Sequence, residues 1–146
     1  KNPIKRGRIV DKQGNVLGEH KGVPFYTVGQ RQGLGIARGY PAYISRIDYK
    51  GNKITLGSKD EACAREFSIK EPHFITAWKK KKIVLRVRIR YNHKEAPAHI
   101  ERSGRGFKVK FLRPQFAITP GQSAVFYAGD IVLGGGIIDE VSEATT

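Results

Sequence analysis

The residues best suited to chemistry in this sequence are three arginines at alternate positions. Arg86, Arg88 and Arg90 alternate with apolar and aromatic residues in the run from 83 to 91 (Ile-Val-Leu-Arg-Val-Arg-Ile-Arg-Tyr). The alternation predicts a half-buried β-strand, with Tyr91 and the aliphatic residues on the face opposite the arginines. Like charges about 6.6 Å apart on a strand face repel, so a bound polyanion would stabilise them. Arginine also binds phosphate through two parallel hydrogen bonds.

An alternative for these arginines is a solvated strand face paired with carboxylates on neighbouring strands. The phosphate interpretation gains from nearby residues: a second predicted strand, residues 106–111, adds Lys108 and Lys110, and His93 and Lys94 follow the first strand. Tyr91 could stack on an unpaired base, an interaction of about 1–3 kcal/mol. A surface that engages six phosphates would give a slope of log affinity against log salt of roughly −4 to −5.

The composition also favours an anionic partner. The chain has 146 residues, with 27 Lys and Arg against 13 Asp and Glu, a net charge of +14 and a pI of about 10.1. Such an excess indicates nucleic acid, an anionic membrane surface or an acidic protein. No apolar run approaches ~18 residues and no basic amphipathic helix stands out, so we expect no membrane partner. The sequence has no methionine, which suggests a piece of a longer protein.

Enzyme chemistry finds little support in the residue pattern. Cys63, the single cysteine, lies between two alanines and has no neighbouring histidine, so we interpret it as a structural thiol rather than a nucleophile. A lone cysteine also fits a reducing cytoplasm. The four histidines show no metal-ligand spacing, and the aspartates sit mostly at predicted turns. We therefore expect no catalytic residue and no metal site here.

A glycine-rich stretch from Val23 to Gly35 carries a second group of candidates, Gln30 and Arg31, framed by glycines at 29, 33 and 35. Thr27 could cap one short helical turn before them. The glycines permit a tight loop, which could be a structural turn or an RNA-facing loop. A nucleotide cradle is disfavoured because the stretch lacks both the Walker ending and a dinucleotide fingerprint. We expect this chain to bind no cofactor.

The remaining pattern predicts a mainly β protein of two domains, because short alternating runs are separated by Gly and Pro turns. In the first domain, residues 1–65, we expect hairpins from strands 7–11 and 14–18 and from strands 43–48 and 53–57, followed by a helix-compatible segment at 58–66. The second domain, residues 66–146, is predicted to be a small antiparallel β-barrel.

Within the second domain, Trp78 is a candidate core anchor and the lysines from 79 to 82 are a candidate solvated loop. We expect a hairpin from strands 96–101 and 106–111, a loop over 113–122, and a strand over 123–127. A last strand over 131–138 should carry a glycine kink, and residues 139–146 should be frayed.

Several long segments together resemble the C-terminal half of the tRNA-specific 2-thiouridylases. The segments are Val16–Gly22, Tyr26–Ile36 with its Gly-Gln-Arg-Gln-Gly motif, Val87–Tyr91, Ile118–Tyr127 with its Pro-Gly-Gln motif, and Leu133–Ile138. They occur in the family's order over nearly the whole chain. The resemblance implies a central domain, residues 1–65, and a C-terminal barrel that together hold tRNA.

The family resemblance also implies an activity for the full-length protein: ATP-dependent adenylation of a tRNA wobble uridine, then sulfur transfer from a persulfide. The ATP loop and both catalytic cysteine motifs of the family are missing from this sequence, so we expect the chain alone to be non-catalytic. By similarity, Arg90, Tyr91 and Gln122 contact the anticodon arm of tRNA. Gln30 and Arg31 match a family motif, either as RNA contacts or as organisers of the central domain.

Two rival functions remain at this point. The basic chain could be an interaction module that docks an acidic sulfur-carrier protein, which the full-length family member would also meet. Alternatively, Cys63 and a histidine could form an active site of their own.

Overall fold

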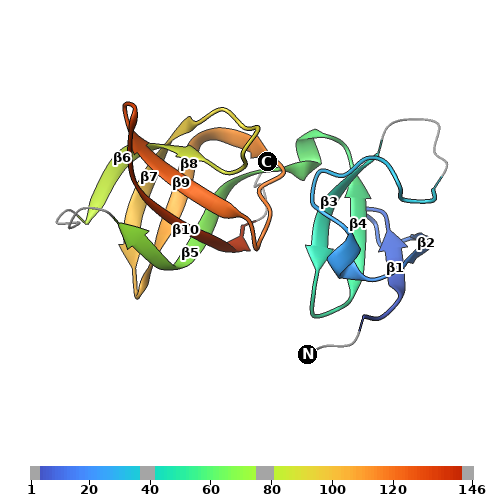
Figure 1. Ribbon diagram of the computed structural model, residues 1–146. Coiled ribbons are helices and arrows are strands. Elements are labelled where there is room, and N and C mark those ends of the chain that lie inside the picture. Colours follow the sequence, from blue (N-terminus) through green and yellow to red (C-terminus); the bar gives the residue numbers. More distant parts are fainter. Residues whose placement is uncertain (1–3, 37–41, 75–80, 143–146) are drawn as a thin grey trace. The chain divides into compact units, whose positions relative to one another are not determined.

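A computed structural model describes residues 4–36, 42–74 and 81–142. The chain forms two compact units, residues 1–63 and 64–146, each described below by itself. The domain boundary predicted from the sequence, between residues 65 and 66, lies two residues after this division. The mainly β fold is confirmed in both units (Figure 1). No helix in the described part of the chain has the length and apolar character needed to cross a bilayer.

The first unit is built on a four-stranded sheet in the order β2-β1-β4-β3. Its strands are β1 Gly7–Val10, β2 Val16–His20, β3 Tyr43–Asp48 and β4 Lys53–Gly57. The two predicted hairpins are confirmed as antiparallel pairs, and β1 joins them by pairing parallel to β4. At the β3–β4 turn Asn52 has a φ of 53°, a left-handed conformation that asparagine tolerates.

One face of this sheet is covered by the segment from 23 to 36. The buried sheet residues Ile9, Ile44 and Ile54 pack with Leu34 of that segment, and Tyr26 and other partly buried residues of the segment join them. The glycine-rich stretch is therefore held against the core. Thr27 does not cap a helix: the 3-10 turn η1 Val23–Phe25 precedes it and has Gly22 at its N-cap.

A buried histidine joins two turns of the first unit. His20 is 1% exposed, and its Nδ1 accepts a hydrogen bond from the Gly22 amide at 3.0 Å. Its Nε2 donates to the Asn52 carbonyl at 2.9 Å. The Asn52 side chain in turn donates to the Arg6 carbonyl. These bonds satisfy both ring nitrogens, so His20 is a structural residue.

The helix expected over 58–66 is only one 3-10 turn, η2 Asp60–Ala62. Ser58 and Glu61 form a reciprocal capping box, because the Ser58 amide donates to Glu61 Oε1 and the Glu61 amide donates to Ser58 Oγ. The turn ends at Cys63, where the chain enters the barrel and buries Ala64. Barrel burial outweighed the helix propensity of this segment, a usual outcome for a weak local preference.

The second unit is a closed barrel in the order β10-β5-β8-β7-β6-β9 (Figure 1). Its six strands are β5 Cys63–Phe74, β6 Lys82–Arg88, β7 Ala96–Ser103, β8 Gly106–Phe116, β9 Ser123–Ala128 and β10 Ile131–Val141. The predicted antiparallel barrel is confirmed. In β10 the predicted glycine irregularity is confirmed as well, since the register to β9 shifts between Val132 and Gly134.

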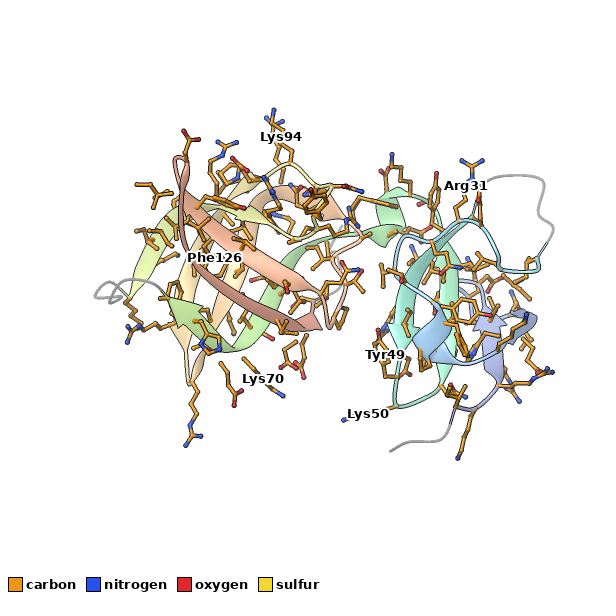
Figure 2. All side chains as sticks on the ribbon, in the orientation of Figure 1. Arg31, Tyr49, Lys50, Lys70, Lys94 and Phe126 are labelled. Atoms are coloured by element: carbon orange, nitrogen blue, oxygen red, sulfur yellow. The ribbon has the colours of Figure 1, made fainter. Side chains whose placement is uncertain are left out.

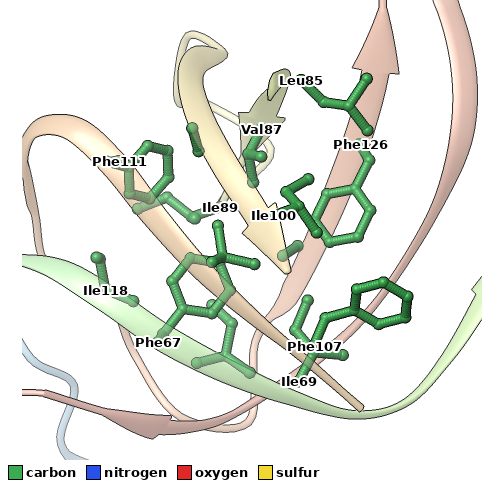
Figure 3. Close-up of a cluster of buried hydrophobic side chains, with 14 of the residues drawn as sticks. Phe67, Ile69, Leu85, Val87, Ile89, Ile100, Phe107, Phe111, Ile118 and Phe126 are labelled. Carbon is green, nitrogen blue, oxygen red and sulfur yellow. The ribbon is translucent and has the colours of Figure 1, made fainter. Parts of the chain in front are cut away.

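Alternation fills the barrel interior as the sequence predicted. Leu85 and Val87 of β6 are buried, as are Phe107, Val109 and Phe111 of β8. All five belong to one cluster with Phe67, Ile100 and Phe126 from other strands, and Phe126 has no exposed surface. Figure 3 shows Leu85, Phe107 and Phe126 in this cluster. The packed interior fixes the outward direction of the polar residues between them.

Three expectations about the barrel were wrong. Tyr91 does not face the core: β6 ends at Arg88, the chain turns, and the Tyr91 side chain is 92% exposed. The segment from 113 to 116 is strand rather than loop. Pro114 is tolerated there because the pairing of β8 with β7 ends at Phe111, so no bond to β7 needs its missing N–H. Residues 139 to 141 are strand rather than frayed, since β10 continues to Val141, and residues 143–146 lie outside the described part of the chain. Trp78, Lys79 and Lys80 lie outside the described residues.

Candidate functional site

Arg86 and Arg88 point outward from β6 and converge on one carboxylate, Glu95, in the connection to β7. Arg88 Nη2 donates to Glu95 Oε2 at 3.3 Å, and Arg86 Nε lies 3.9 Å from Glu95 Oε1. Arg86 Nη2 also donates to the Glu95 carbonyl oxygen at 3.3 Å. The alternative of carboxylate pairing therefore holds for these two arginines, although the carboxylate comes from the connection and not from a neighbouring strand. Two guanidinium groups still face one carboxylate, so this group of three side chains has a net charge of +1.

Arg90 serves a different purpose from the other two. Its Nη1 and Nη2 donate to the carbonyl oxygens of Ala117 and Phe116 at 3.0 and 3.1 Å, and its guanidinium lies over the Phe116 ring at 5.8 Å. Burial lowers the pKa of Arg90, which nevertheless remains ionised at neutral pH. Ala117 is buried at a φ of 59°, and its carbonyl also accepts a hydrogen bond from Thr119 Oγ1. Arg90 thus fastens the end of β6 to the segment that leads into β9.

Gln122 lies at the same end of the barrel. Its amide donates to the Thr119 carbonyl, and its own carbonyl accepts from the Ile138 amide at 2.9 Å. Antiparallel pairing of Arg88 with Val125 brings the start of β9 to the point where β6 ends. Arg90, Tyr91 and Gln122, which the family resemblance singled out, are therefore gathered at one end of the barrel.

His93 and Lys94 belong to this barrel end too. The His93 amide donates to the Arg90 carbonyl, and Lys94 projects away from the barrel (Figure 2). Burial and then the charge of Arg90 lower the pKa of His93, against an opposing hydrogen bond with the Lys94 backbone. The shift favours the neutral imidazole, and Arg90 and Lys94 supply the positive charge of this turn.

Lys108 and Lys110 do not extend the arginine face directly. Strand β7 lies between β6 and β8, and its Glu101 stands between Lys82 and Lys108 in the register. In the next row His99 stands between Val84 and Lys110. The two basic strands are thus separated by a row that contains an acid.

The glycine-rich loop of the first unit separates the roles of Gln30 and Arg31. The Gln30 side chain accepts from the Thr27 amide at 3.1 Å and donates to the Gln32 carbonyl at 2.8 Å. The Gln30 backbone bonds Ile44 of β3, so this residue organises the loop. Arg31 is exposed and points away from the sheet (Figure 2). It remains available for an anion.

Three backbone amides of this loop are used inside the first unit. A phosphate cradle needs backbone N–H groups directed at the ligand. The amides of Thr27, Gly29 and Gln30 are instead bonded to Gln30 Oε1, the Ile44 carbonyl and the Thr27 carbonyl. These three amides are therefore not directed at a ligand.

Cys63 has the properties of a structural thiol. Its Sγ donates to the Lys59 carbonyl at 3.4 Å. Burial, followed by the negative charge of Asp60 and opposed by Lys59, raises the pKa of the thiol. The thiolate needed for nucleophilic attack is therefore disfavoured at neutral pH. Among the residues that the structure describes, no three His, Cys, Asp or Glu side chains gather as metal ligands would.

Sequence reasoning missed two partners at the barrel end, Glu95 and the carbonyl pair of Phe116 and Ala117. Glu95 could have been suspected, because it is an acid in the short connection between two predicted strands. The carbonyl pair had no signal in the sequence, since residues 113–122 were interpreted as a loop and their backbone direction depends on Ala117.

The positive charge is shared equally between the two units. Residues 1–63 contain 12 Lys and Arg against 5 Asp and Glu, and residues 64–146 contain 15 against 8, so each unit has a net charge of +7. Neither unit is therefore excluded as an anion-binding surface by its charge.

Comparison with known proteins gives a consistent family. Residues 2–58 match the tRNA methyl transferase PRC-barrel domain, and residues 64–138 match the aminomethyltransferase beta-barrel domain. The tRNA-specific 2-thiouridylase MnmA of Acetivibrio thermocellus is 49% identical over 92% of this chain and 38% of its own length. Those of Desulforamulus reducens and Caldanaerobacter subterraneus are 48% and 49% identical over 94% and 95% of the chain. The chain spans about two fifths of these relatives' length. It belongs to the tRNA-specific 2-thiouridylase family.

Proposed function

We propose that this chain is the tRNA-binding part of a 2-thiouridylase and that it has no catalytic activity by itself. The observation that carries the proposal is the barrel end, where a 92% exposed tyrosine stands beside a group of arginines in a chain of this family. Soluble proteins rarely leave an aromatic ring so open, and stacking on an unpaired base is a known use of one.

Each residue of the barrel end has a separate role in this proposal. Arg86 and Arg88 attract phosphates, which position the RNA without reading its sequence. Tyr91 stacks on a base. Gln122 lies at the same end of the barrel, where its buried Oε1 has no hydrogen-bond partner among the described residues, and its side-chain NH₂ is the group left for RNA. Arg90 contributes its charge and holds the segment from Phe116 to Gln122 in place. In the first unit, Arg31 adds a phosphate contact from a loop that Gln30 keeps rigid.

The chemistry itself is assigned to a catalytic region outside this sequence. We propose that this region uses ATP to adenylate the wobble uridine and receives sulfur as a persulfide from a carrier protein. The present chain would hold the anticodon arm in reach of it. Translation-related RNA and a lone cysteine are in keeping with action in the cytoplasm.

The proposal is tested by titrating the chain with unfractionated tRNA at several salt concentrations. About six engaged phosphates predict a slope of log affinity against log salt of roughly −4 to −5. Tyr91→Ala should weaken binding by roughly 5- to 150-fold, the equivalent of a stacking energy of about 1–3 kcal/mol. Tyr49→Ala is the matched control, because Tyr49 is a half-exposed tyrosine of the first unit. No binding at low salt, or a flat salt dependence, would refute the proposal.

The same variants address the rival carrier-docking function. A double variant with Arg90→Ala and Tyr91→Ala should lose tRNA. If it keeps tRNA but loses an acidic sulfur-carrier protein, the barrel end is a protein-docking surface.

A further inference from the structure

The pairing of Glu95 with two arginines is made loosely. Charge-assisted N–H to carboxylate bonds are typically about 2.7–2.9 Å long, whereas the two side-chain contacts of Glu95 are 3.3 and 3.9 Å. The Arg86 side chain is 47% exposed and the Arg88 side chain 34%. Ion pairs of this kind contribute about 0–1 kcal/mol. Little free energy therefore holds Glu95 on the arginines.

Glu95 also leaves part of the hydrogen-bonding capacity of the arginines unused. Arg88 Nε is buried and has no hydrogen-bond partner among the described residues. The Arg88 guanidinium lies over the Tyr127 ring at 5.3 Å, which holds its plane against the barrel wall. The Glu95 carboxylate contacts one nitrogen of each guanidinium and bridges the two, rather than forming a bidentate pair with either.

The group of Arg86, Arg88 and Glu95 lies close in the chain to the exposed Tyr91. Arg88 is the last residue of β6, and Tyr91 follows three residues later in the turn that leads to Glu95. A strand of RNA that stacks a base on Tyr91 brings its backbone close to this turn, because each base is attached to a ribose whose oxygens carry the flanking phosphates. Glu95 occupies the space between the two nearest guanidinium groups on β6.

We propose that the Glu95 carboxylate occupies the position that a backbone phosphate takes when RNA binds, and that RNA displaces this carboxylate. This inference rests on the proposed function, and it names the group that RNA must replace. The exchange is of one anion for another: the phosphodiester takes the N–H groups of Arg86 and Arg88, and the Glu95 carboxylate moves into solvent. The carboxylate thereby weakens the attraction of the barrel end for any polyanion.

The test compares two isosteric variants of the chain, Glu95→Gln and Glu101→Gln. Each removes one negative charge from the barrel, but Glu101 is on β7 between two lysine positions and away from the arginines. Glu95→Gln should bind tRNA up to about five-fold more tightly at low salt, the equivalent of a surface ion pair. Its slope of log affinity against log salt should stay close to that of wild type, because RNA displaces Glu95 in the wild-type chain too and the number of phosphate contacts is the same. Glu101→Gln should leave the affinity close to that of wild type.

Other results would overturn the inference. Weaker tRNA binding by Glu95→Gln would mean that Glu95 positions the arginines and that RNA does not displace it. Equal effects of the two variants would mean that only net charge matters. Because Glu95→Gln keeps a side chain that can accept from Arg88, its unfolding midpoint should stay close to wild type. If the wild-type chain binds no tRNA at all, the proposed function fails first, which distinguishes that outcome from failure of the Glu95 inference.

Discussion

Replacing Arg90 by alanine should destabilise the barrel although Arg90 is on its surface. The guanidinium donates two hydrogen bonds, at 3.0 and 3.1 Å, to the carbonyl oxygens of Ala117 and Phe116. Bonds from charged donors contribute about 1.5–3 kcal/mol each. We take about 1 kcal/mol per bond, because Arg90 is only partly buried and water can replace its guanidinium at the two carbonyl oxygens. The expected loss is therefore about 2 kcal/mol.

Chemical denaturation followed by tryptophan fluorescence or circular dichroism measures this loss directly. A loss of about 2 kcal/mol corresponds to a melting temperature lower by roughly 4–8 °C if the chain unfolds as one unit, and by about twice that if the barrel unfolds alone. Arg90→Lys should lose about half as much, since lysine keeps the charge but cannot reach two carbonyls with a planar fork.

Arg86→Ala is the matched control for Arg90→Ala. Arg86 is on β6, just before the turn that carries Arg90, but its contacts are the longer ones to Glu95 and its side chain is half exposed. Its loss should be within about 0.5 kcal/mol. Equal stability of the Arg86 and Arg90 variants would show that Arg90 does not fasten the segment before β9. The different roles assigned to the three arginines would then be mistaken.

Further predictions concern the barrel core, the glycine-rich loop of the first unit and the turn η2. Phe126→Ala should destabilise the barrel by about 3–5 kcal/mol, because the ring is fully buried among other aromatic side chains; a loss under 1 kcal/mol on denaturation would contradict the packing described. Gln30→Ala should cost about 1–2 kcal/mol through the lost bonds to Thr27 and Gln32, and unchanged amide exchange in the loop would argue against an organising role. The Ser58 backbone amide lowers the pKa of Glu61, so stability from this carboxylate is present above its unfolded pKa and is lost as the pH falls through its lower folded pKa. Denaturation melts from pH 6 to pH 3 should therefore show a smaller loss in Glu61→Gln than in wild type, and identical profiles would contradict this.

The sequence predicted the parts of the fold that depend on local pattern. Alternation at Leu85 and Val87, and again at Phe107 and Val109, identifies strands with one buried face because successive side chains point to opposite sides. The same alternation wrongly placed Tyr91 on the core side, because β6 ends at Arg88, before the alternation ends. No local signal in the sequence marks the last paired residue of the strand. The helix expected near Cys63 failed for the opposite reason: burial of Ala64 in the barrel depends on residues far away in the chain.

The candidate site was predictable as a set of residues and unpredictable as a set of contacts. The family motifs located Arg90, Tyr91 and Gln122, and strand pairing brought them together. The contacts of the arginines could not be foreseen, because they depend on the register between β6 and β7 and on the left-handed backbone at Ala117. Both are properties of the closed barrel rather than of any short segment.

Amide hydrogen–deuterium exchange of the chain with and without tRNA tests the central claim most directly. Binding at the barrel end predicts slower exchange in residues 88–95 and 117–122 when tRNA is added. The β7–β8 hairpin tip, residues 103–106, should be unaffected. Protection confined to that hairpin or to the outer strands of the first unit, with none in residues 88–95, would contradict the claim that RNA is held by the end of the barrel.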